Sequence, residues 1–546
     1  MFKDLIDIAI IDDGINEGLF DIGDLKYNIE ITSELNIIER KGYNKYLPSH
    51  ATTCAAIIRK YSPYAVLSSI KILNNKRRGL PEQLVKSIEW CADVGIRIVN
   101  LSLGTVHYKD RHVLRNVVNK AVKKGLIIIA ACSNNNIITY PSCFSSVIGV
   151  KCDLDNELRE GEYIYNYNAC DGIDVTACCG HLLRKNNGDE FYSSICNSFA
   201  TPLVTAKVCE IIKSNKKIML EEIKLKLFEG ATKRAGKVYT PYLYNKIDWI
   251  ETAVVFKIGN AKIRSFKSCN EFKVVDVIYL NCDCLWYVLK DITDYLDKDY
   301  EILKEVDTVI IVVDTPLLKH IDCSFEDLLH EIAFRGKNIV YFNDNEKDSN
   351  LEFFNSKYNI KVWHPSIYRY LNFPVLKKID IPPILVIYDF SGEYLIDLIT
   401  ELQECFRLEY YNIVSASDTC LGIVKEVEYL PLFKNGKLDH NGLKTVCGIY
   451  KPDIILYGID ASDKNAEYLN FIGKHFEVDV NIIISNNYNQ VIEDLISSKE
   501  DNQVIFLTTL SFFCNKKNVT TFELSSNDYV NEIYSYIIDL YKAHND

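Results

Sequence analysis

The stretch of sequence that decides the fold is residues 6–14, which read Ile-Asp-Ile-Ala-Ile-Ile-Asp-Asp-Gly. The apolar run predicts a buried strand that ends at the carboxylate of Asp12, with a turn at Gly14. In open parallel sheets, ligands bind beyond the carboxyl ends of the strands. The strand would therefore deliver Asp12 to the functional edge of a sheet. On this stretch alone, however, a helix N-cap or turn role for Asp12 is the stronger interpretation.

Short apolar runs alternate with helical patterns through residues 1–250. Further strands are predicted at residues 68–73, 96–101, 126–131 and 146–152. Helices are predicted at residues 53–60, 80–94, 113–124, 199–214 and 221–229. This alternation indicates an α/β fold in which right-handed crossovers place helices on both faces of a parallel sheet.

The remainder of the chain predicts two more α/β modules of Rossmann-like character, at residues 251–380 and 381–546, with the boundary marked by Pro382 and Pro383. The first has expected strands at 273–280, 308–314, 338–342 and 360–363, and helices at 325–334 and 351–357. The second has strands at 384–388, 410–415, 454–457, 480–485 and 504–507, and helices at 393–405, 489–498 and 528–542. The turn at residues 389–393 has one glycine and two acids, so phosphate binding there is not expected. Docking or homodimerisation is the simplest expected role of these modules.

Composition excludes several classes of protein. The 546 residues are 48% hydrophobic and carry a formal net charge of −12, so the chain is globular and lacks the bulk basic charge of a nucleic-acid binder. Its apolar runs are too short to span a membrane. The first residues do not form a signal peptide, so the 18 cysteines are expected to be reduced thiols in the cytoplasm. The cysteines and histidines show no zinc-site spacing, and neither a metal nor a cofactor is expected.

Three further segments carry polar side chains that fit one reaction. Residues 48–56 read PSHATTCAA and place His50 at the start of a helix of small residues. Residues 196–202 read CNSFATP and place Ser198 at the positive end of a helix with a proline in its first turn. Residues 128–134 end a buried strand at Asn134, a neutral donor that could stabilise an oxyanion. Taken singly, each has a plainer interpretation: a surface histidine, a serine N-cap and a polar turn.

Together these segments resemble the subtilisin-like serine peptidases over residues 5–235. The family motifs D-x-G, H-G-T-H-V-A, A-A-G-N and G-T-S-M-A-x-P are matched, in chain order, by residues 12–14, 50–55, 131–134 and 196–202. Two supporting stretches, residues 98–104 and 140–150, also resemble the family. The resemblance implies a subtilisin-like parallel sheet and a catalytic triad.

In the roles that the resemblance implies, His50 takes the proton of the Ser198 hydroxyl and Asp12 orients His50. Asn134 and the Ser198 N–H bind the oxyanion. Ser102, Leu103 and Gly104 pair with an extended peptide substrate. The resemblance also implies that residues 102–105 and 131–134 line the primary specificity pocket, whose depth depends on the tertiary structure.

Several residues depart from the family motifs. Ala51 and Ser133 replace glycines, Thr53 replaces a second histidine, and Cys196 and Asn197 replace Gly-Thr before the nucleophile. A glycine lost at a tight turn can force the backbone to move. All four side chains with direct chemical roles are nevertheless of the right type, which favours an active peptidase over an inactive, peptide-binding scaffold.

The place of Asp12 close to Met1 leaves no room for an N-terminal propeptide, so an intracellular protease of restricted specificity is expected. Residues 415–418, 421–423 and 429–431 give the C-terminal half a fainter resemblance to proteins of bacterial peptide-maturation clusters. This resemblance implies removal of the leader from a modified precursor peptide, which the C-terminal half would bind. A general cytosolic turnover protease and a catalytically weak scaffold remain as alternatives.

Overall fold

The computed structural model describes residues 5–74, 76–135, 137–232, 244–259, 271–280, 285–298, 301–313, 325–342, 358–371, 379–434, 437–498, 503–509, 518–526 and 528–545. The chain divides into two compact units, Met1–Trp249 and Ile250–Asp546. The helix expected at residues 351–357 lies outside the described residues. Among the residues described, no helix combines the length and the apolar character needed to cross a bilayer.

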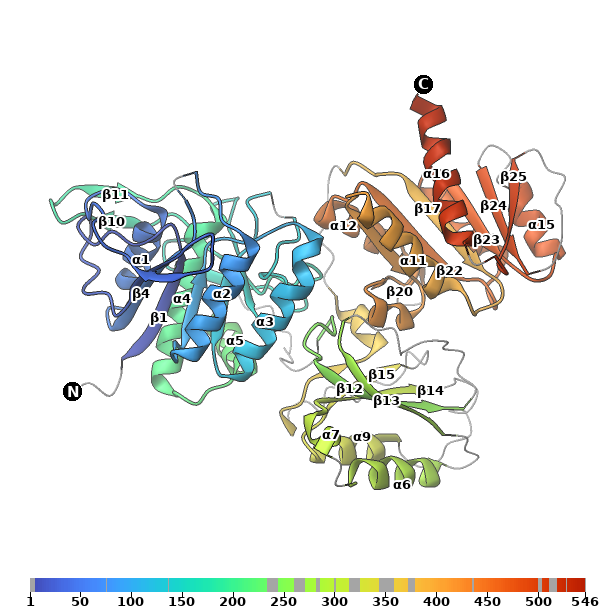
Figure 1. Ribbon diagram of the computed structural model, residues 1–546, viewed down its shortest axis with the longest axis horizontal. Helices are drawn as coiled ribbons and strands as arrows, with labels where there is room; N and C mark the ends of the chain where they lie inside the picture. Colours follow the sequence, from blue (N-terminus) through green and yellow to red (C-terminus); the bar gives the residue numbers. More distant parts are fainter. Residues whose placement is uncertain are drawn as a thin grey trace. The chain divides into compact units, whose positions relative to one another are not determined.

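The N-terminal unit, coloured blue to green in Figure 1, is built on a sheet of nine strands. Their order in the sheet is β3-β2-β4-β1-β5-β6-β7-β9-β8. The strands are β1 (Ile6–Asp12), β2 (Asn28–Ile31), β3 (Ile37–Glu39), β4 (Ala65–Lys71), β5 (Ile98–Leu101), β6 (Ile127–Ala131), β7 (Ile148–Cys152), β8 (Tyr163–Tyr165) and β9 (Val175–Ala177). Every pairing is parallel except β2 with β3 and β8 with β9, at the two edges. A separate hairpin pairs β10 (Leu182–Arg184) with β11 (Glu190–Tyr192). The predicted parallel α/β sheet is confirmed, and the short antiparallel edge strands are additions to it.

Helices cover both faces of this sheet. The helices are α1 (His50–Tyr61), α2 (Pro81–Asp93), α3 (Arg111–Lys123), α4 (Asn197–Ser214) and α5 (Leu220–Gly230), with the short η1 (Tyr108–Asp110) before α3. One apolar cluster joins alternate residues of β1 to the buried faces of α1, α4 and α5. Helices α2 and α3 lie together against the opposite face. Because both faces are covered, the central strands are apolar at almost every position.

The C-terminal unit holds two further parallel sheets. The five-stranded sheet has the order β13-β12-β14-β15-β16, and the seven-stranded sheet has the order β19-β18-β22-β17-β23-β24-β25. Strand β12, which lies between β13 and β14, was not predicted, because its apolar run directly follows the expected boundary at residue 250. The five-stranded sheet comprises β12 (Thr252–Ile258), β13 (Lys273–Leu280), β14 (Thr308–Val313), β15 (Asn338–Phe342) and β16 (Val362–Trp363), with α6 (Leu285–Leu296), α7 (Glu301–Glu305), α9 (Phe325–Phe334) and η2 (Pro365–Tyr370).

The seven-stranded sheet comprises β17 (Ile384–Asp389), β18 (Ile413–Ser417), β19 (Glu428–Tyr429), β22 (Ile454–Asp460), β23 (Val480–Ile484), β24 (Gln503–Thr508) and β25 (Val519–Glu523). Its helices are α11 (Leu395–Leu408), η3 (Cys420–Lys425), α12 (Asn441–Tyr450), α13 (Ala466–Leu469), α14 (Phe471–His475), α15 (Gln490–Ser497) and α16 (Tyr529–Asn545). A small hairpin pairs β20 (Phe433–Lys434) with β21 (Lys437–Leu438).

The backbone N–H groups of the turn after β17 bind a side-chain carboxylate from the end of the same strand. The buried carboxylate of Asp389 accepts hydrogen bonds from the backbone N–H groups of Ser391, Gly392, Tyr394 and Leu395, at 2.8 to 3.1 Å. These N–H groups precede or open α11, where a phosphate would be bound in a nucleotide-binding loop. They are already occupied by a side chain of the same loop.

Candidate active site

Strand order brings three chain segments to one edge of the N-terminal sheet. Strands β1, β5 and β6 are adjacent and parallel, so their carboxyl ends lie side by side. These ends lead to Asp12, to Ser102 and to Asn134 respectively. The N-termini of α1 and α4 bring His50 and Ser198 to the same region. The Sγ atom of Cys54 in α1 lies 4.0 Å from Nδ1 of His50 and 3.8 Å from the carbonyl oxygen of Ser198 in α4.

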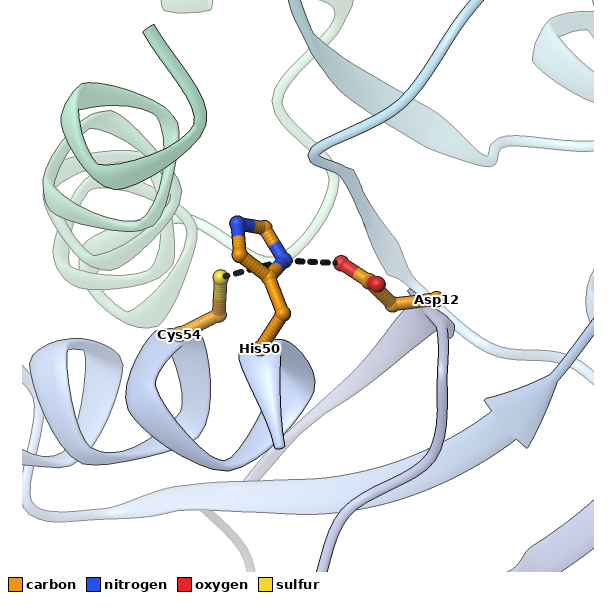
Figure 2. A group of neighbouring side chains, drawn as sticks. All are labelled: Asp12, His50 and Cys54. Carbon is orange, nitrogen blue, oxygen red and sulfur yellow. Dashed lines mark hydrogen bonds and ion pairs between the residues drawn. The ribbon is translucent and has the colours of Figure 1, made fainter. Parts of the chain in front are cut away.

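Asp12 and His50 form a buried pair. Nδ1 of His50 lies 2.7 Å from Oδ2 of Asp12, and the two side chains are 14% and 2% exposed (Figure 2). The other oxygen of Asp12 accepts the N–H of Asp13 at 2.8 Å. Figure 2 shows the second ring nitrogen of His50 directed away from Asp12. With Nδ1 bonded to the carboxylate, this second nitrogen is left to act as a base.

Asp13 fixes the backbone of His50, a role that sequence reasoning missed. Its two carboxylate oxygens accept the N–H groups of His50 at 3.0 Å and Ala51 at 2.9 Å. A carboxylate at a helix N-terminus satisfies free donors and interacts favourably with the helix dipole. The two consecutive acids at the end of β1 were the sequence signal for this arrangement. Asp12 orients the imidazole of His50, and Asp13 binds the first N–H groups of the helix that carries it.

The surroundings of His50 favour its protonated form. Burial works against the charged imidazole, but hydrogen bonds to Asp12, Cys196 and Cys54 outweigh it and raise the pKa of His50 above its usual 6.5. Burial raises the pKa of the Cys54 thiol, so this side chain is uncharged at neutral pH. Asp12 is therefore the group whose charge stabilises an imidazolium ion here.

Cys54 lies beneath this pair, one helical turn after His50. Its Sγ lies 4.0 Å from Nδ1 of His50 and 3.5 Å from Oγ of Ser102. The donor atoms of Asp12, His50 and Cys54 lie within 4.8 Å of one another, as a soft divalent metal ion would require. Such an ion would have to replace the hydrogen bond between Asp12 and His50.

Ser198 lies in the first turn of α4, next to the imidazole. The ring of His50 stacks on Phe199 with the ring centroids 5.0 Å apart. The Ser198 hydroxyl donates to the carbonyl of Ser102 at 3.2 Å, while Oγ of Ser102 donates back to the carbonyl of Ser198 at 2.9 Å. Within the part of the chain that the structure describes, no hydrogen bond joins His50 to Ser198. The hydroxyl proton must therefore turn from Ser102 to the imidazole before base catalysis can begin, and such bonds often form only with substrate bound.

Asn134 is exposed, and its amide is held in one orientation. Oδ1 accepts the backbone N–H of Asn197 at 3.0 Å. Among the described residues, Nδ2 of Asn134 has no hydrogen-bond partner, so it remains available as a donor. Nδ2 of Asn134 and the backbone N–H groups at the start of α4 therefore offer hydrogen-bond donors to a developing negative charge beside Ser198.

Asn197 joins three segments beneath the nucleophile, a second role that sequence reasoning missed. Its side chain is only 1% exposed. Oδ1 accepts the N–H of Cys152 at 2.7 Å, and Nδ2 donates to the carbonyls of Ser133 at 2.6 Å and Cys132 at 3.2 Å. This residue replaces a threonine of the family motif, and its longer side chain ties α4 to the ends of β6 and β7.

The residues that replace glycines adopt ordinary backbone conformations. Cys196, the N-cap of α4, has a φ of −162° and a ψ of 156°, an extended conformation open to any residue. Ala51 lies inside α1, and neither Ala51 nor Ser133 is among the described residues with positive φ. The backbone at these positions therefore does not require glycine, which removes the expected cause of distortion.

Residues 102–104 follow β5 and border the candidate nucleophile. Ser102 is 8% exposed, Leu103 is half-buried and Gly104 is exposed. Just beyond them, Thr105 forms an antiparallel bridge with Tyr140, with N–O distances of 2.9 and 2.8 Å. The expected substrate-binding segment thus lies against Ser198 on one side and residues 139–140 on the other.

Comparison with known proteins places similarity in the N-terminal unit. Residues 4–240 match the model of the Subtilase family. Subtilisin DY of Bacillus licheniformis is 28% identical over 250 residues, covering 43% of this chain and 86% of the relative. Subtilisin BL of Lederbergia lenta is 27% identical over 156 residues, covering 28% of this chain and 56% of the relative. The chain thus spans little more than half the length of subtilisin BL.

Two solved structures are also similar to part of this chain. Sphericase matches with a TM-score of 0.35 and 22% identity, covering 41% of this chain and 82% of that one. A lanthipeptide protease matches with a TM-score of 0.33 and 16% identity, covering 42% of this chain and 81% of that one.

Proposed function

Because residues 4–240 form a domain of the subtilase family, we propose that this protein is a serine endopeptidase in which Asp12, His50 and Ser198 form the catalytic triad. The observation that carries the proposal is the buried 2.7 Å hydrogen bond between Asp12 and His50, beside a serine in the first turn of α4. A carboxylate that holds one imidazole nitrogen leaves the other to take the proton of a hydroxyl.

In the proposed reaction, His50 accepts the Ser198 proton as Oγ attacks the carbonyl carbon of a peptide bond. The carbonyl oxygen becomes an oxyanion that accepts hydrogen bonds from Nδ2 of Asn134 and the N–H of Ser198. The imidazolium ion then protonates the leaving amine, and water hydrolyses the acyl-enzyme by the same route. The residues 102–104 pair with the substrate backbone as an added strand.

We further propose that the substrate is a ribosomally made, modified precursor peptide, from which the enzyme removes the leader. The support is the resemblance of residues 415–418, 421–423 and 429–431 to proteins of bacterial peptide-maturation clusters. The C-terminal unit, with its two further parallel sheets, would bind the precursor or a second copy of the chain. The thirteen cysteines described in the structure are all free thiols, which supports action in a reducing compartment such as the cytoplasm. A general turnover protease is the enzymatic alternative.

A second candidate is a catalytically weak scaffold that binds peptides. The observation in its favour is the Ser198 hydroxyl, which donates to the Ser102 carbonyl and makes no hydrogen bond to His50 among the described contacts. In this alternative, residues 102–104 would bind an extended peptide without its cleavage.

The test is labelling of the purified full-length chain with a small fluorophosphonate, which reacts with an activated serine. We expect labelling of the wild type that is lost in Ser198→Ala and strongly reduced in His50→Ala and Asp12→Asn. Ser194→Ala removes an exposed serine four positions earlier and should label like the wild type. Labelling should rise with pH through the raised pKa of His50, with a midpoint above 6.5, because only the neutral imidazole can accept the proton.

A folded wild-type chain that does not label, alone or with precursor peptide, would refute the endopeptidase proposal. Peptide binding without cleavage that is unaffected by Ser198→Ala would then identify the scaffold. Cleavage confined to a modified precursor would support maturation, whereas digestion of casein would support general turnover.

A further inference from the structure

His181 connects the two helices that carry His50 and Ser198. It lies directly before β10, and its side chain is fully buried. Nδ1 of its ring lies 2.9 Å from the hydroxyl oxygen of Tyr61, the last residue of α1. Nε2 lies 3.1 Å from the carbonyl oxygen of Phe199, in the first turn of α4. Because His50 is the first residue of α1, this one ring joins the far end of its helix to the helix of the nucleophile.

The hydrogen bonds determine which nitrogen of His181 carries the proton. A carbonyl oxygen can only accept, so Nε2 donates to Phe199 and Nδ1 accepts the hydroxyl proton of Tyr61. Oε1 of Glu160 is a second acceptor near that hydroxyl, at the longer distance of 3.3 Å. Burial lowers the pKa of His181 to about 4, so the ring is neutral at neutral pH. With both nitrogens bonded, the ring is held in one tautomer and one orientation.

The backbone of His181 is fixed as well as its side chain. Its N–H donates to Oγ of Ser193 at 2.8 Å, and its carbonyl accepts the N–H of Ser193 at 3.0 Å. The hydroxyl of Ser193 donates in turn to the carbonyl of Cys179 at 2.7 Å. The imidazole is therefore a rigid support for the first turn of α4.

The residue that His181 supports is in contact with the base of the proposed reaction. The ring of Phe199 stacks on the ring of His50 with an interplanar angle of 26° and the centroids 5.0 Å apart. Phe199 is buried, so water is largely excluded from this contact. The face of an aromatic ring attracts a cation within about 6 Å of its centroid, and more strongly where water is excluded. His50 becomes a cation when it takes the Ser198 proton, so the stack stabilises the charged imidazole more than the neutral one.

We propose that His181 is a positioning residue of the peptidase reaction, which holds the Phe199 ring stacked on His50 so that the ring stabilises the imidazolium ion. The inference rests on the proposed endopeptidase function and adds a residue that acts through Phe199 without touching the substrate. The plainer role of a buried histidine is to stabilise the fold alone. The two roles differ in one measurable property, because only the positioning role changes the proton affinity of His50.

The experiment measures the rate constant for labelling by the small fluorophosphonate as a function of pH, at temperatures where each full-length variant is folded. Phe199→Leu removes the aromatic face and keeps most of the bulk, so the midpoint of the pH profile should fall by about 0.5–1 unit. The limiting rate at high pH should fall by about three- to tenfold, since the same stabilisation is lost when the imidazolium ion forms. Phe191→Leu, at a half-buried phenylalanine of β11, is the matched control and should leave both quantities unchanged.

Variants of His181 test the link itself. His181→Leu should lower the midpoint in the same direction, because the Phe199 carbonyl loses its bond and the ring is no longer held. His181→Gln offers an amide N–H in place of the Nε2–H, so its midpoint should return towards that of wild type. In the Phe199→Leu background, His181→Leu should shift the midpoint no further, because His181 acts through the ring. If His181→Leu does not fold, Tyr61→Phe takes its place, since it leaves Nδ1 unpaired, and its midpoint should lie between those of wild type and Phe199→Leu.

An unchanged midpoint and limiting rate in Phe199→Leu would overturn the inference. A folded His181→Leu, or Tyr61→Phe in its place, that melts at a lower temperature but keeps the wild-type midpoint would leave His181 a structural role only and overturn it as well. Absence of labelling in the wild type is a different result, which refutes the endopeptidase function itself, and the inference with it.

Discussion

Replacement of Asn197 by alanine should both destabilise the N-terminal unit and impair the candidate active site. The buried side chain makes at least three hydrogen bonds, to Cys152, Ser133 and Cys132. At about 1 kcal/mol net for each bond, the loss amounts to about 3 kcal/mol, and more where a buried partner is left unpaired. For a domain of this size, about 2–4 °C in Tm per kcal/mol predicts a decrease of about 6–12 °C.

The same change should slow labelling by a fluorophosphonate. Asn197 ties the start of α4, which carries Ser198, to the end of β6, which leads to Asn134. Alanine keeps the backbone N–H that donates to Asn134 but loses the side-chain bonds to Ser133 and Cys132, so the serine and the oxyanion donor are held less firmly at their separation. The rate of labelling is measured well below the lowered Tm, so that a slower rate reports on the site and not on unfolding.

The matched control is Asn215→Ala, at the exposed far end of the same helix. Its free energy of unfolding should change by less than about 0.5 kcal/mol, as is usual for surface changes, which corresponds to a Tm shift of less than about 2 °C. Its labelling rate should match that of wild type. The reasoning would be refuted if Asn197→Ala melted within 2 °C of wild type and labelled at the wild-type rate.

Three further outcomes are expected. Asn134→Ala should slow peptide cleavage by roughly 100- to 1000-fold, because one oxyanion donor is lost, and should lower the Tm by only about 2–4 °C, because its one bond to the Asn197 N–H is lost as well. Asn135→Ala should have little effect on cleavage, and equal effects of the two would contradict the oxyanion role. Burial lowers the pKa of His181 to about 4 from 6.5, so the unfolded chain binds a proton that the folded chain does not, and the N-terminal unit should lose stability as pH falls between these values. Urea unfolding of wild type and His181→Gln at several pH values checks this, and parallel curves would exclude it. Burial raises the pKa of Asp418 from 3.8 to about 7, so the C-terminal unit should lose stability as pH rises through that interval, and Asp418→Asn should flatten the dependence measured in the same way.

Residues with direct chemical roles could be proposed from the sequence because their signals are local. Asp12, His50, Asn134 and Ser198 each occur at a predicted strand end or helix start, and the structure brings all four to one edge of the sheet. Asp13 gave a weaker signal, because a second acid after a strand has many ordinary uses. Its capping of α1 became visible only through contacts with residues 37 and 38 positions away.

The helices and strands likewise divide into those with a clear local sequence signal and those without one. Strands at residues 273–280 and 338–342 and the helix at 325–334 agree with the structure at both ends. The interior strand β12 was missed, because an apolar run beside a presumed boundary carries no periodicity that identifies it as a strand. Only its pairing with β13 and β14 identifies it as part of the sheet.

The sequence by itself determined the α/β class, the order of the chemical groups along the chain and their types, because apolar runs and functional side chains are properties of short segments. The tertiary structure alone decided which groups meet. Asn197 reaches the ends of β6 and β7 across 45 and more positions, and the Ser198 hydroxyl donates to the carbonyl of Ser102. Hydrogen bonds and steric exclusion act over a few ångströms in space, and distances along the chain do not reveal which residues come that close.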